Sequence, residues 1–183
     1  MASGKGWMER IRSHRLRLIV ATLVLMSCIG CDQATKSLAT LSMRDAPART
    51  YLNGIVRIEY ALNAGCCLNL GSTLPSAVRS VLFIGLNGCL MLAVCSFLFF
   101  KRDLPFFAYL AILLLLAGGI GNLIDRVTNQ GLVTDFLNLG IGPVRTGIFN
   151  VADIAVTCGA LAILVWTYRQ SSAARPLATT VPV

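Results

Sequence analysis

The chain has 183 residues, of which 56% are hydrophobic and 13% are charged, and its mean hydropathy is +0.73. This composition excludes an ordinary water-soluble domain, in which about a quarter of the residues are charged. The formal net charge of +8 does not indicate nucleic-acid binding, because the basic residues gather beside apolar segments.

Four apolar segments are each long enough to cross a bilayer, which takes about 20 residues in a helix. In chain order they are Leu18–Cys31 with a less apolar continuation to Leu41, Val81–Phe100, Leu104–Ile124 and about Ile148–Trp166. The fold class predicted is therefore an all-α membrane protein with four transmembrane helices in one membrane domain, residues 18–168. A basic N-terminus, residues 1–17, precedes this domain, and residues 169–183 are expected to form a disordered cytoplasmic tail.

The basic residues predict the topology. They cluster before the first helix, between the second and third, and after the fourth: Lys5, Arg10, Arg12, Arg15, Arg17, Lys101, Arg102, Arg169 and Arg175. A chain that crosses the membrane four times places all these clusters on one side, and Lys and Arg are enriched in cytoplasmic loops. Both termini are therefore predicted to be cytoplasmic, where the basic clusters contact anionic lipid.

The loop between the first two helices, about residues 42–76, is predicted to lie outside and to contain β-structure. Within it, apolar and polar residues alternate from Ile55 to Tyr60, the pattern of a half-buried strand.

Four of the eight acidic residues are predicted to reach one depth near the outer interface. Asp32 lies near the outer end of the first helix and Asp125 at the outer end of the third. Asp135 lies in the short connection between the third and fourth helices, and Asp153 lies just inside the fourth. A carboxylate at this depth is costly unless it is paired or faces a cavity, so these residues are candidates for a functional site.

Structural roles for some of these acids remain open. Asp32 and Lys36 are four residues apart on one helical face and can form a structural ion pair. Asp125 can pair with its neighbour Arg126, and Asp153 can cap the start of the fourth helix.

Two carboxylates that meet in a partly dry site favour general acid–base chemistry. They do not both ionise easily, so one acts as a base and the other as a proton donor, which suits the attack of water on an amide. Asn122 and Asn150 each precede an Asp by three residues and can orient it. The only histidine, His14, lies in the basic N-terminus, so neither a Ser–His pair nor a zinc site is expected. No metal and no cofactor is predicted.

Five motifs occur in a characteristic order: Asp32-Gln33-Ala34-Thr35-Lys36, Asn63-Ala64-Gly65, Gly118-Gly119-Ile120-Gly121-Asn122-Leu123-Ile124-Asp125-Arg126, Val133-Thr134-Asp135-Phe136 and Phe149-Asn150-Val151-Ala152-Asp153. In this order and spacing, the chain resembles the bacterial lipoprotein signal peptidase (signal peptidase II) family. The resemblance implies a multi-pass aspartic peptidase of the bacterial inner membrane, with its active site at the outer face. Such an enzyme removes the signal peptide of diacylglyceryl-modified prolipoproteins, cutting before the lipidated cysteine.

The resemblance also implies roles for individual residues. The catalytic pair carries over to Asp135 and Asp153. The supporting polar and small residues carry over to Asp32, Lys36, Asn63, Gly65, Asn122, Asp125, Arg126, Asn150 and Ala152. Asn63 and Arg126 are expected near the substrate backbone or lipid head, and a small β-rich platform is expected over Arg49–Leu70. The implied partners are prolipoproteins and membrane lipid, without nucleic acid or a required oligomer.

One departure from the family pattern concerns the platform. After Asn-x-Gly the family usually has two small residues and Phe, whereas this chain has Cys66-Cys67-Leu68. This difference bears on substrate preference and removes no catalytic group.

Three other functions compete with this interpretation. Leu25–Cys28 resembles a lipobox, and a basic start before a short apolar run is typical of a signal peptide. Cleavage there would remove the helix that places Asp32 and Lys36 in the membrane. A small ion or proton channel would carry acids at successive depths rather than at one level. A catalytically degenerate family member or a four-helix scaffold is the third alternative.

Overall fold

The computed structural model describes residues 3–65, 74–101 and 103–173. The four helices are α1 (Ser3–Met43), α2 (Ser76–Phe100), α3 (Phe106–Thr128) and α4 (Val151–Ala173). The four strands are β1 (Arg49–Tyr51), β2 (Val56–Asn63), β3 (Val133–Ile141) and β4 (Val144–Arg145). All four helices contain a stretch that is long and apolar enough to cross a membrane. The prediction of a mostly helical protein with four transmembrane helices is thus confirmed.

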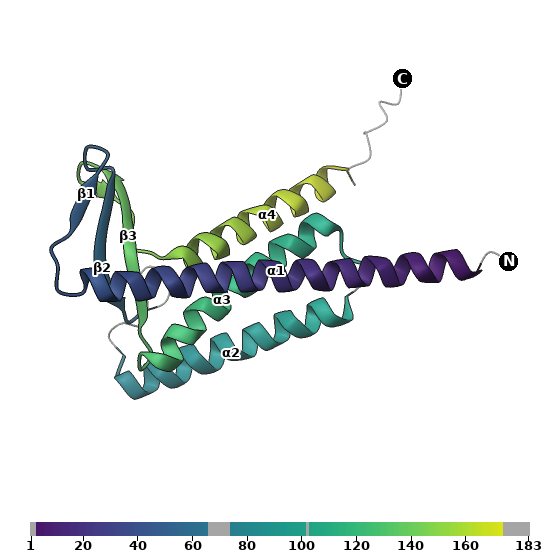
Figure 1. The fold of residues 1–183 in the computed structure, drawn as a ribbon, viewed down its shortest axis with the longest axis horizontal. Coiled ribbons are helices and arrows are strands. Elements are labelled where there is room, and N and C mark those ends of the chain that lie inside the picture. Colours follow the sequence, from purple (N-terminus) through teal and green to yellow (C-terminus); the bar gives the residue numbers. More distant parts are fainter. Residues whose placement is uncertain (1–2, 66–73, 102, 174–183) are drawn as a thin grey trace, which may run out of the picture.

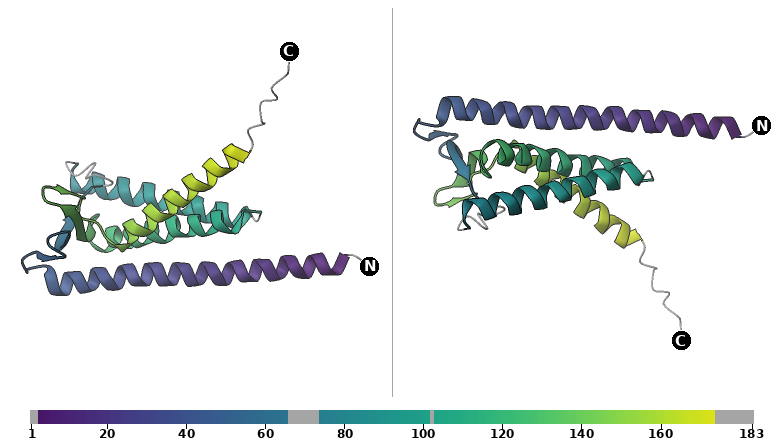
Figure 2. Two further views of the ribbon diagram at one scale, coloured as in Figure 1. Left: turned by 90° about the horizontal axis from the view of Figure 1, so that it is seen from above. Right: turned by 90° about the horizontal axis from the view of Figure 1, so that it is seen from below.

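Helices α1, α2 and α3 run in roughly the same direction, with the sheet across one end of them, and α4 diverges from them toward its C-terminal end (Figures 1 and 2). The N-terminal end of α1 and the C-terminal end of α4 both lie at the opposite end (Figure 2). The basic residues in the N-terminal part of α1 are therefore separated from the sheet by the length of the bundle.

Helix α3 is the centre of the bundle, because it packs against each of the other three helices. Small residues permit the closest of these contacts. A Cβ atom on Gly118 would lie 2.4 Å from the Ala152 carbonyl oxygen, and one on Gly159 would lie 2.7 Å from the Ala111 carbonyl oxygen. The stripe of small residues in α3 and α4 is therefore a packing surface that brings the start of α4 against α3.

Large apolar side chains are exposed on the outer faces of the other helices, as expected where lipid replaces water as the solvent. Examples are Met26, Leu41, Leu86, Leu92, Phe100 and Leu164. The small buried apolar cluster of Leu104, Tyr109 and Leu113 lies instead where the start of α3 packs against α1. Arg17 of α1 donates a 2.6 Å hydrogen bond to the Leu104 carbonyl there, and the Tyr109 hydroxyl donates to the Arg17 carbonyl.

The sheet is antiparallel, with the strand order β1-β2-β3-β4. The predicted half-buried strand over residues 55–60 is confirmed as part of β2. The prediction confined the β-structure to the loop between α1 and α2, whereas half of the strands come from the connection between α3 and α4. β3 pairs with β2, and this pairing satisfies backbone groups that would otherwise be buried without partners. Asp135 is consequently a strand residue and does not lie in a short, irregular connection.

The helix ends differ from the predicted limits. α1 begins at Ser3, so the basic segment continues the first helix, and α4 begins only after Asn150. α4 extends to Ala173 and includes residues 169–173, which the sequence assigned to the tail. The rest of the predicted tail, the end of the predicted platform and Cys66-Cys67-Leu68 lie outside the described residues.

The contact between α3 and α4 is expected to tolerate no added methyl group. Gly118→Ala should lower the free energy of unfolding by about 1–3 kcal/mol, because the new Cβ would overlap the backbone of α4. The matched control is Gly88→Ala in α2, where a Cβ meets nothing within 4 Å; it should be neutral or stabilise by about 1 kcal/mol or less. Thermal unfolding in detergent measures both variants, and equal stability of the two would contradict this packing.

Candidate active site

A bulge in β2 places Asp135 beside Asn63. Ile58 pairs with Leu137, but the next pair is Ala61 with Asp135, so β2 contributes one extra residue between the two pairs. Beyond the bulge, Asn63 pairs with Val133 and lies on the same face as Asp135. The Asn63 side-chain amide donates a 2.9 Å hydrogen bond to Asp135 Oδ2.

The start of α4 holds Asp153 through a reciprocal capping box. The Asn150 side-chain oxygen accepts a hydrogen bond from the Asp153 backbone N–H at 3.0 Å. The Asp153 carboxylate accepts one from the Asn150 backbone N–H at 3.1 Å. The predicted alternative, that Asp153 caps the fourth helix, is thus confirmed. The cap leaves Asp153 Oδ1 to accept a 2.9 Å hydrogen bond from the Asn122 side chain of α3.

Asn150 links the two acids of the predicted catalytic pair. Its side chain is fully buried, and its Nδ2 donates a 2.7 Å hydrogen bond to Asp135 Oδ1. Its oxygen meanwhile accepts from the Asp153 backbone. Phe149, the preceding residue, pairs with Leu137 of β3, which brings the start of α4 to the edge of the sheet. The Asn150 side chain therefore binds the strand carboxylate and the Asp153 backbone, while the Asn150 backbone N–H binds the Asp153 carboxylate.

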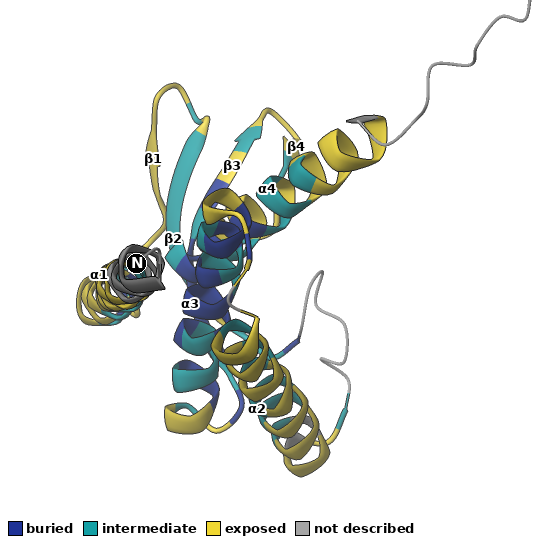
Figure 3. Cartoon of the chain, turned by 90° about the vertical axis from the view of Figure 1, so that its right-hand side faces the viewer, coloured by how far each residue is buried: buried dark blue, intermediate teal, exposed yellow. Residues whose placement is uncertain are grey.

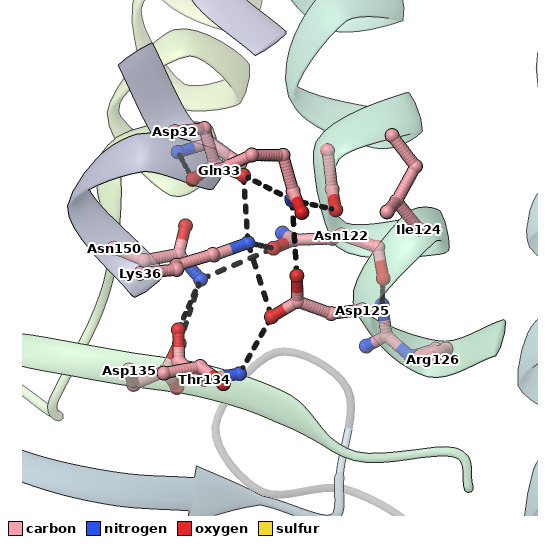
Figure 4. A network of polar contacts seen from close by, with 12 residues as sticks. Asp32, Gln33, Lys36, Asn122, Ile124, Asp125, Arg126, Thr134, Asp135 and Asn150 are labelled. Atoms are coloured by element: carbon pink, nitrogen blue, oxygen red, sulfur yellow. Dashed lines mark hydrogen bonds and ion pairs between the residues drawn. The ribbon is translucent and has the colours of Figure 1, made fainter. Parts of the chain in front are cut away.

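A buried charge cluster lies on the other side of Asn122 (Figure 4). The Lys36 ammonium of α1 lies 2.8 Å from Asp32 Oδ2, 3.0 Å from Asn122 Oδ1 and 3.4 Å from Asp125 Oδ2. Lys36 and both acids are almost completely buried. The three N–H donors of the ammonium thus match three acceptors. The predicted ion pair of Asp32 with Lys36 is confirmed, whereas Asp125 pairs with Lys36 instead of with its neighbour Arg126.

Both carboxylates of this charge cluster also hold a backbone group of the site. Asp32 Oδ1 accepts a 2.8 Å hydrogen bond from the Ala152 N–H in the first turn of α4. Asp125 Oδ2 accepts one from the Thr134 N–H, next to Asp135, also at 2.8 Å. Ala152 and Thr134, which directly precede the two acids in the chain, are therefore positioned by carboxylates from α1 and α3.

Arg126 connects α3 with the segment that directly follows β2. Its guanidinium donates to the Asn122 carbonyl at 3.2 Å and to the Gly65 carbonyl at 3.3 Å. The Gly65 N–H in turn donates to the Asn63 side chain at 2.9 Å, and the guanidinium lies over the Phe83 ring. The buried Arg126 Nε has no hydrogen-bond partner among the described residues. Arg126 and Asn63 thus meet at one end of the site.

Burial raises the pKa of Asp135 from its ordinary value to about 6, and the nearby Asp153 charge adds to the rise. The hydrogen bonds from Asn63 and Asn150 and the charge of Lys36 act in the opposite direction. This pKa lies much closer to neutral pH than that of an ordinary carboxyl group, which suits an acid–base catalyst.

All eleven predicted site residues lie in this connected region, but sequence reasoning missed three others. Gln33 Nε2 lies within 3.2 Å of Asp32 Oδ2, the Gly121 carbonyl and Asp125 Oδ1, and so ties the two acids together. A Cβ on Gly121 would lie 2.6 Å from Asp32 Oδ2, so only glycine leaves room for that carboxylate. Thr134 contributes through its backbone alone. Gln33 and Gly121 both lie inside motifs that the sequence analysis identified, and this position was the available indication that they belong to the site.

No group of three or more His, Cys, Asp or Glu side chains among the described residues is arranged to hold a metal ion. The polar groups that meet at Asp135 and Asp153 are carboxylates and amides.

Comparison with known proteins shows consistent similarity. Residues 24–169 match the family model described as signal peptidase (SPase) II. The chain is 31% identical over 149 residues to a lipoprotein signal peptidase of Streptococcus pneumoniae, covering 81% of this chain and 92% of that protein. It is 37% identical over 159 residues to one of Parasynechococcus marenigrum, covering 84% and 90%. A solved bacterial membrane enzyme superposes with a TM-score of 0.75 at 25% identity, covering 88% of this chain and 94% of that one.

The buried ammonium is expected to be essential for stability. Lys36→Met should lower the free energy of unfolding by about 3–5 kcal/mol, because it leaves Asp32 and Asp125 as buried like charges without a counterion. The matched control is Lys101→Met at the exposed end of α2, which should change it by about 0.5 kcal/mol or less. Thermal unfolding at fixed detergent and pH compares them; a Lys36→Met protein as stable as the control would refute a role for the cluster in holding the helices.

Proposed function

The chain belongs to the signal peptidase II family, and we propose that it is an aspartic endopeptidase that removes signal peptides from diacylglyceryl-modified prolipoproteins. One observation carries the proposal: Asp135 and Asp153, from a strand and a helix, are held by the same buried Asn150 side chain. Relatives at 31% and 37% identity are named lipoprotein signal peptidases, which supports prolipoproteins as the substrate class. The bond proposed to be cut is the amide before the lipidated cysteine.

In the proposed mechanism, Asp135 starts protonated and Asp153 starts ionised. The raised pKa of Asp135 supports the first assignment. Asp153 accepts hydrogen bonds from the Asn122 side chain and the Asn150 backbone, and such donors suit a charged acceptor. Asp153 takes a proton from a water molecule while the oxygen of that water bonds to the scissile carbonyl carbon. At the same time, Asp135 donates its proton to the carbonyl oxygen. This step yields a tetrahedral diol.

The second step returns the site to its starting state. Asp135 takes back a proton from the diol as the carbonyl reforms, the carbon–nitrogen bond breaks, and Asp153 gives its proton to the leaving nitrogen. Asn150 contacts the Asp135 carboxyl group through its side-chain nitrogen and the Asp153 carboxyl group through its backbone N–H, so it can keep both carboxyl groups in place while their charges exchange.

The proposed orientation places the site at the outer face of the inner membrane, with both termini cytoplasmic. The sheet and the acids lie at the end of the bundle opposite the basic N-terminal end of α1, which supports this orientation (Figure 1). The signal helix and the acyl chains of the substrate would stay in the bilayer. Burial of lipid chains at about 0.8 kcal/mol per CH₂ supplies binding energy without sequence-specific contacts.

The arrangement of acids favours hydrolysis over proton conduction. The site carboxylates gather at the sheet end of the bundle, whereas Leu104, Tyr109 and Leu113 pack together near the other end. A conducting path would need polar groups at successive depths between these two regions.

Removal of either carboxylate should abolish processing. In Asp135→Asn and Asp153→Asn, cleavage of a lipidated prolipoprotein should fall by about 10²–10⁴-fold or more, because each amide replaces a group that transfers a proton. The matched control, Asp45→Asn, changes an exposed acid of the outer loop and should retain full activity. The mobility shift on signal-peptide loss measures cleavage by purified protein in detergent, with a prolipoprotein lacking the diacylglyceryl group run alongside. Full activity in either mutant would overturn the aspartic mechanism, and equal cleavage of both substrate forms would overturn the lipid requirement.

The pH profile should show the titration of Asp135. A raised pKa means that the group keeps its proton to higher pH, so kcat/KM should fall as pH rises through about 6. Asn63→Ala removes a hydrogen bond that lowers this pKa, so the falling limb should move to higher pH. Asp45→Asn should leave the limb in place. A limb that moves to lower pH, or does not move, in Asn63→Ala would contradict the assignment of Asp135 as the proton donor.

A further inference from the structure

One face of the sheet, away from the acid pair, carries two arginine side chains. Arg57 of β2 pairs directly with Asn138 of β3, and Arg145 of β4 pairs with Gly140 of β3. Residues that pair directly, or that lie two apart along a strand, share one face of a sheet. Both arginines therefore lie on the same face. Asp135 precedes Asn138 by three residues along β3, so it lies on the other face.

The Arg145 side chain reaches across β3 toward β2. A Cβ atom on Gly140 would lie 2.6 Å from Arg145 Cγ, so the glycine leaves room for this side chain. The guanidinium donates a hydrogen bond to the Asn138 side chain through Nε and, at 2.8 Å, one to the Gly54 carbonyl through Nη1. Because Asn138 is also the cross-strand neighbour of Arg57, the two arginine side chains are neighbours of one asparagine.

Arg57, in contrast to Arg145, has no hydrogen-bond partner among the described residues, and its Nε is buried without an acceptor. In the described part of the chain, no ion pair involves Arg57, Arg145 or Glu59, the acid two residues farther along β2. Segment 66–73, which the structure does not describe, contains no acidic residue. Two neighbouring positive charges on this face therefore have no counter-charge among the described residues.

Two guanidinium groups in this arrangement suit carboxylates. A guanidinium presents its N–H donors in a planar fork that matches a carboxylate, and such hydrogen bonds are stronger than those between neutral groups. Arg145 supplies a charge that Asn138 and Gly54 already hold in place, so little conformational entropy is lost when it binds. Arg57 supplies donors that are still free, and a buried donor without an acceptor is unfavourable until an acceptor binds.

The arginine face lies within reach of a polypeptide that leaves the acid pair. From Asp135 to Asn138 is about 10 Å along β3, and from Asp135 to Gly140 is about 17 Å. The strands extend away from α1, α2 and α3 (Figure 3), and the edge strand β4 is only two residues long. A chain that passes this edge to the other face would reach the arginines after roughly four to ten extended residues.

We propose that Arg57 and Arg145 form a docking site for acidic residues in the mature part of the prolipoprotein, roughly the fourth to the tenth residue after the cleaved bond. Leu139 and Ile141, the exposed apolar residues of β3, lie on the other face of the sheet, so the arginine face fits an acidic polypeptide better than a lipid chain. The docking site rests on the proposed peptidase function and adds a preference among its substrates. It acts on substrate binding, because it lies away from the reacting atoms.

Two forms of one lipidated prolipoprotein test the proposal. They differ only between about the fourth and the tenth residue after the lipidated cysteine, where one form carries glutamates and the other glutamines. With the wild-type protein in a neutral detergent at low ionic strength, KM for the glutamate form should be about 3–10-fold lower, and kcat should be the same for both. About 0.5 M salt should remove most of this difference, because it screens charges at a protein surface.

Variants assign the preference to this face. Arg57→Gln should bring the two KM values to within about twofold of each other, and Arg57→Glu should reverse the preference. The matched control is Arg49→Gln, which removes the same charge from an exposed residue that pairs with Ile58 on the other face of the sheet. It should keep the wild-type preference. Cleavage of the glutamine form by each variant shows that the protein is folded.

Equal KM values for the two forms in the wild type at low ionic strength would overturn the docking site. A preference that persists in Arg57→Gln would also overturn it, as would one that is lost equally in Arg49→Gln, since that would show an effect of net charge alone. Failure of the folded wild-type protein to cleave either form would instead overturn the proposed peptidase function.

Discussion

The buried ammonium of Lys36 is the interaction on which the rest of the site depends. Two carboxylates, Asp32 and Asp125, are almost completely buried at the end of a helical bundle, where neither can stay charged without a counterion. With Lys36 between them, each carboxylate also accepts a hydrogen bond from a backbone N–H: Asp32 from Ala152 through its other oxygen, and Asp125 from Thr134 through the oxygen that faces Lys36. The charge cluster therefore determines where the first turn of α4 and the start of β3 lie, one residue from each acid of the proposed pair.

The close approach of α3 and α4 makes this cluster possible. Gly118 lets the first turn of α4 touch α3, and Gly121 leaves the space that the Asp32 carboxylate occupies. A larger residue at 121 would displace Asp32 and remove the acceptor from the Ala152 N–H. The small residues of α3 thus allow close packing, and this packing in turn positions the acids of the site. The same motif therefore has both a packing role and a functional role.

The four helices, their order and the depth of the acids could be predicted from the sequence, because apolar length and charge placement are local signals. The pairing of β2 with β3 could not, because Val56–Asn63 and Val133–Ile141 lie far apart in the chain and a bulge shifts their register. Asp135 and Asp153 were identified through family motifs, whereas Asn150 as the bridge between them depends on three-dimensional contacts. Gln33 was missed because its role arises from residues of α3 that become its neighbours only when the helices pack.

The sheet sets the position of the site relative to the helix bundle. Asp135 and Ile141 are six residues apart on β3, which corresponds to about 20 Å along an extended strand. Since the strands cross the ends of the helices instead of continuing along them, this separation runs across the bundle and not along it (Figure 1). The packing of α3 against α4 and the pairing of β2 with β3 therefore bring the two acids together at one end of the bundle, where burial raises the pKa of the Asp135 carboxyl group.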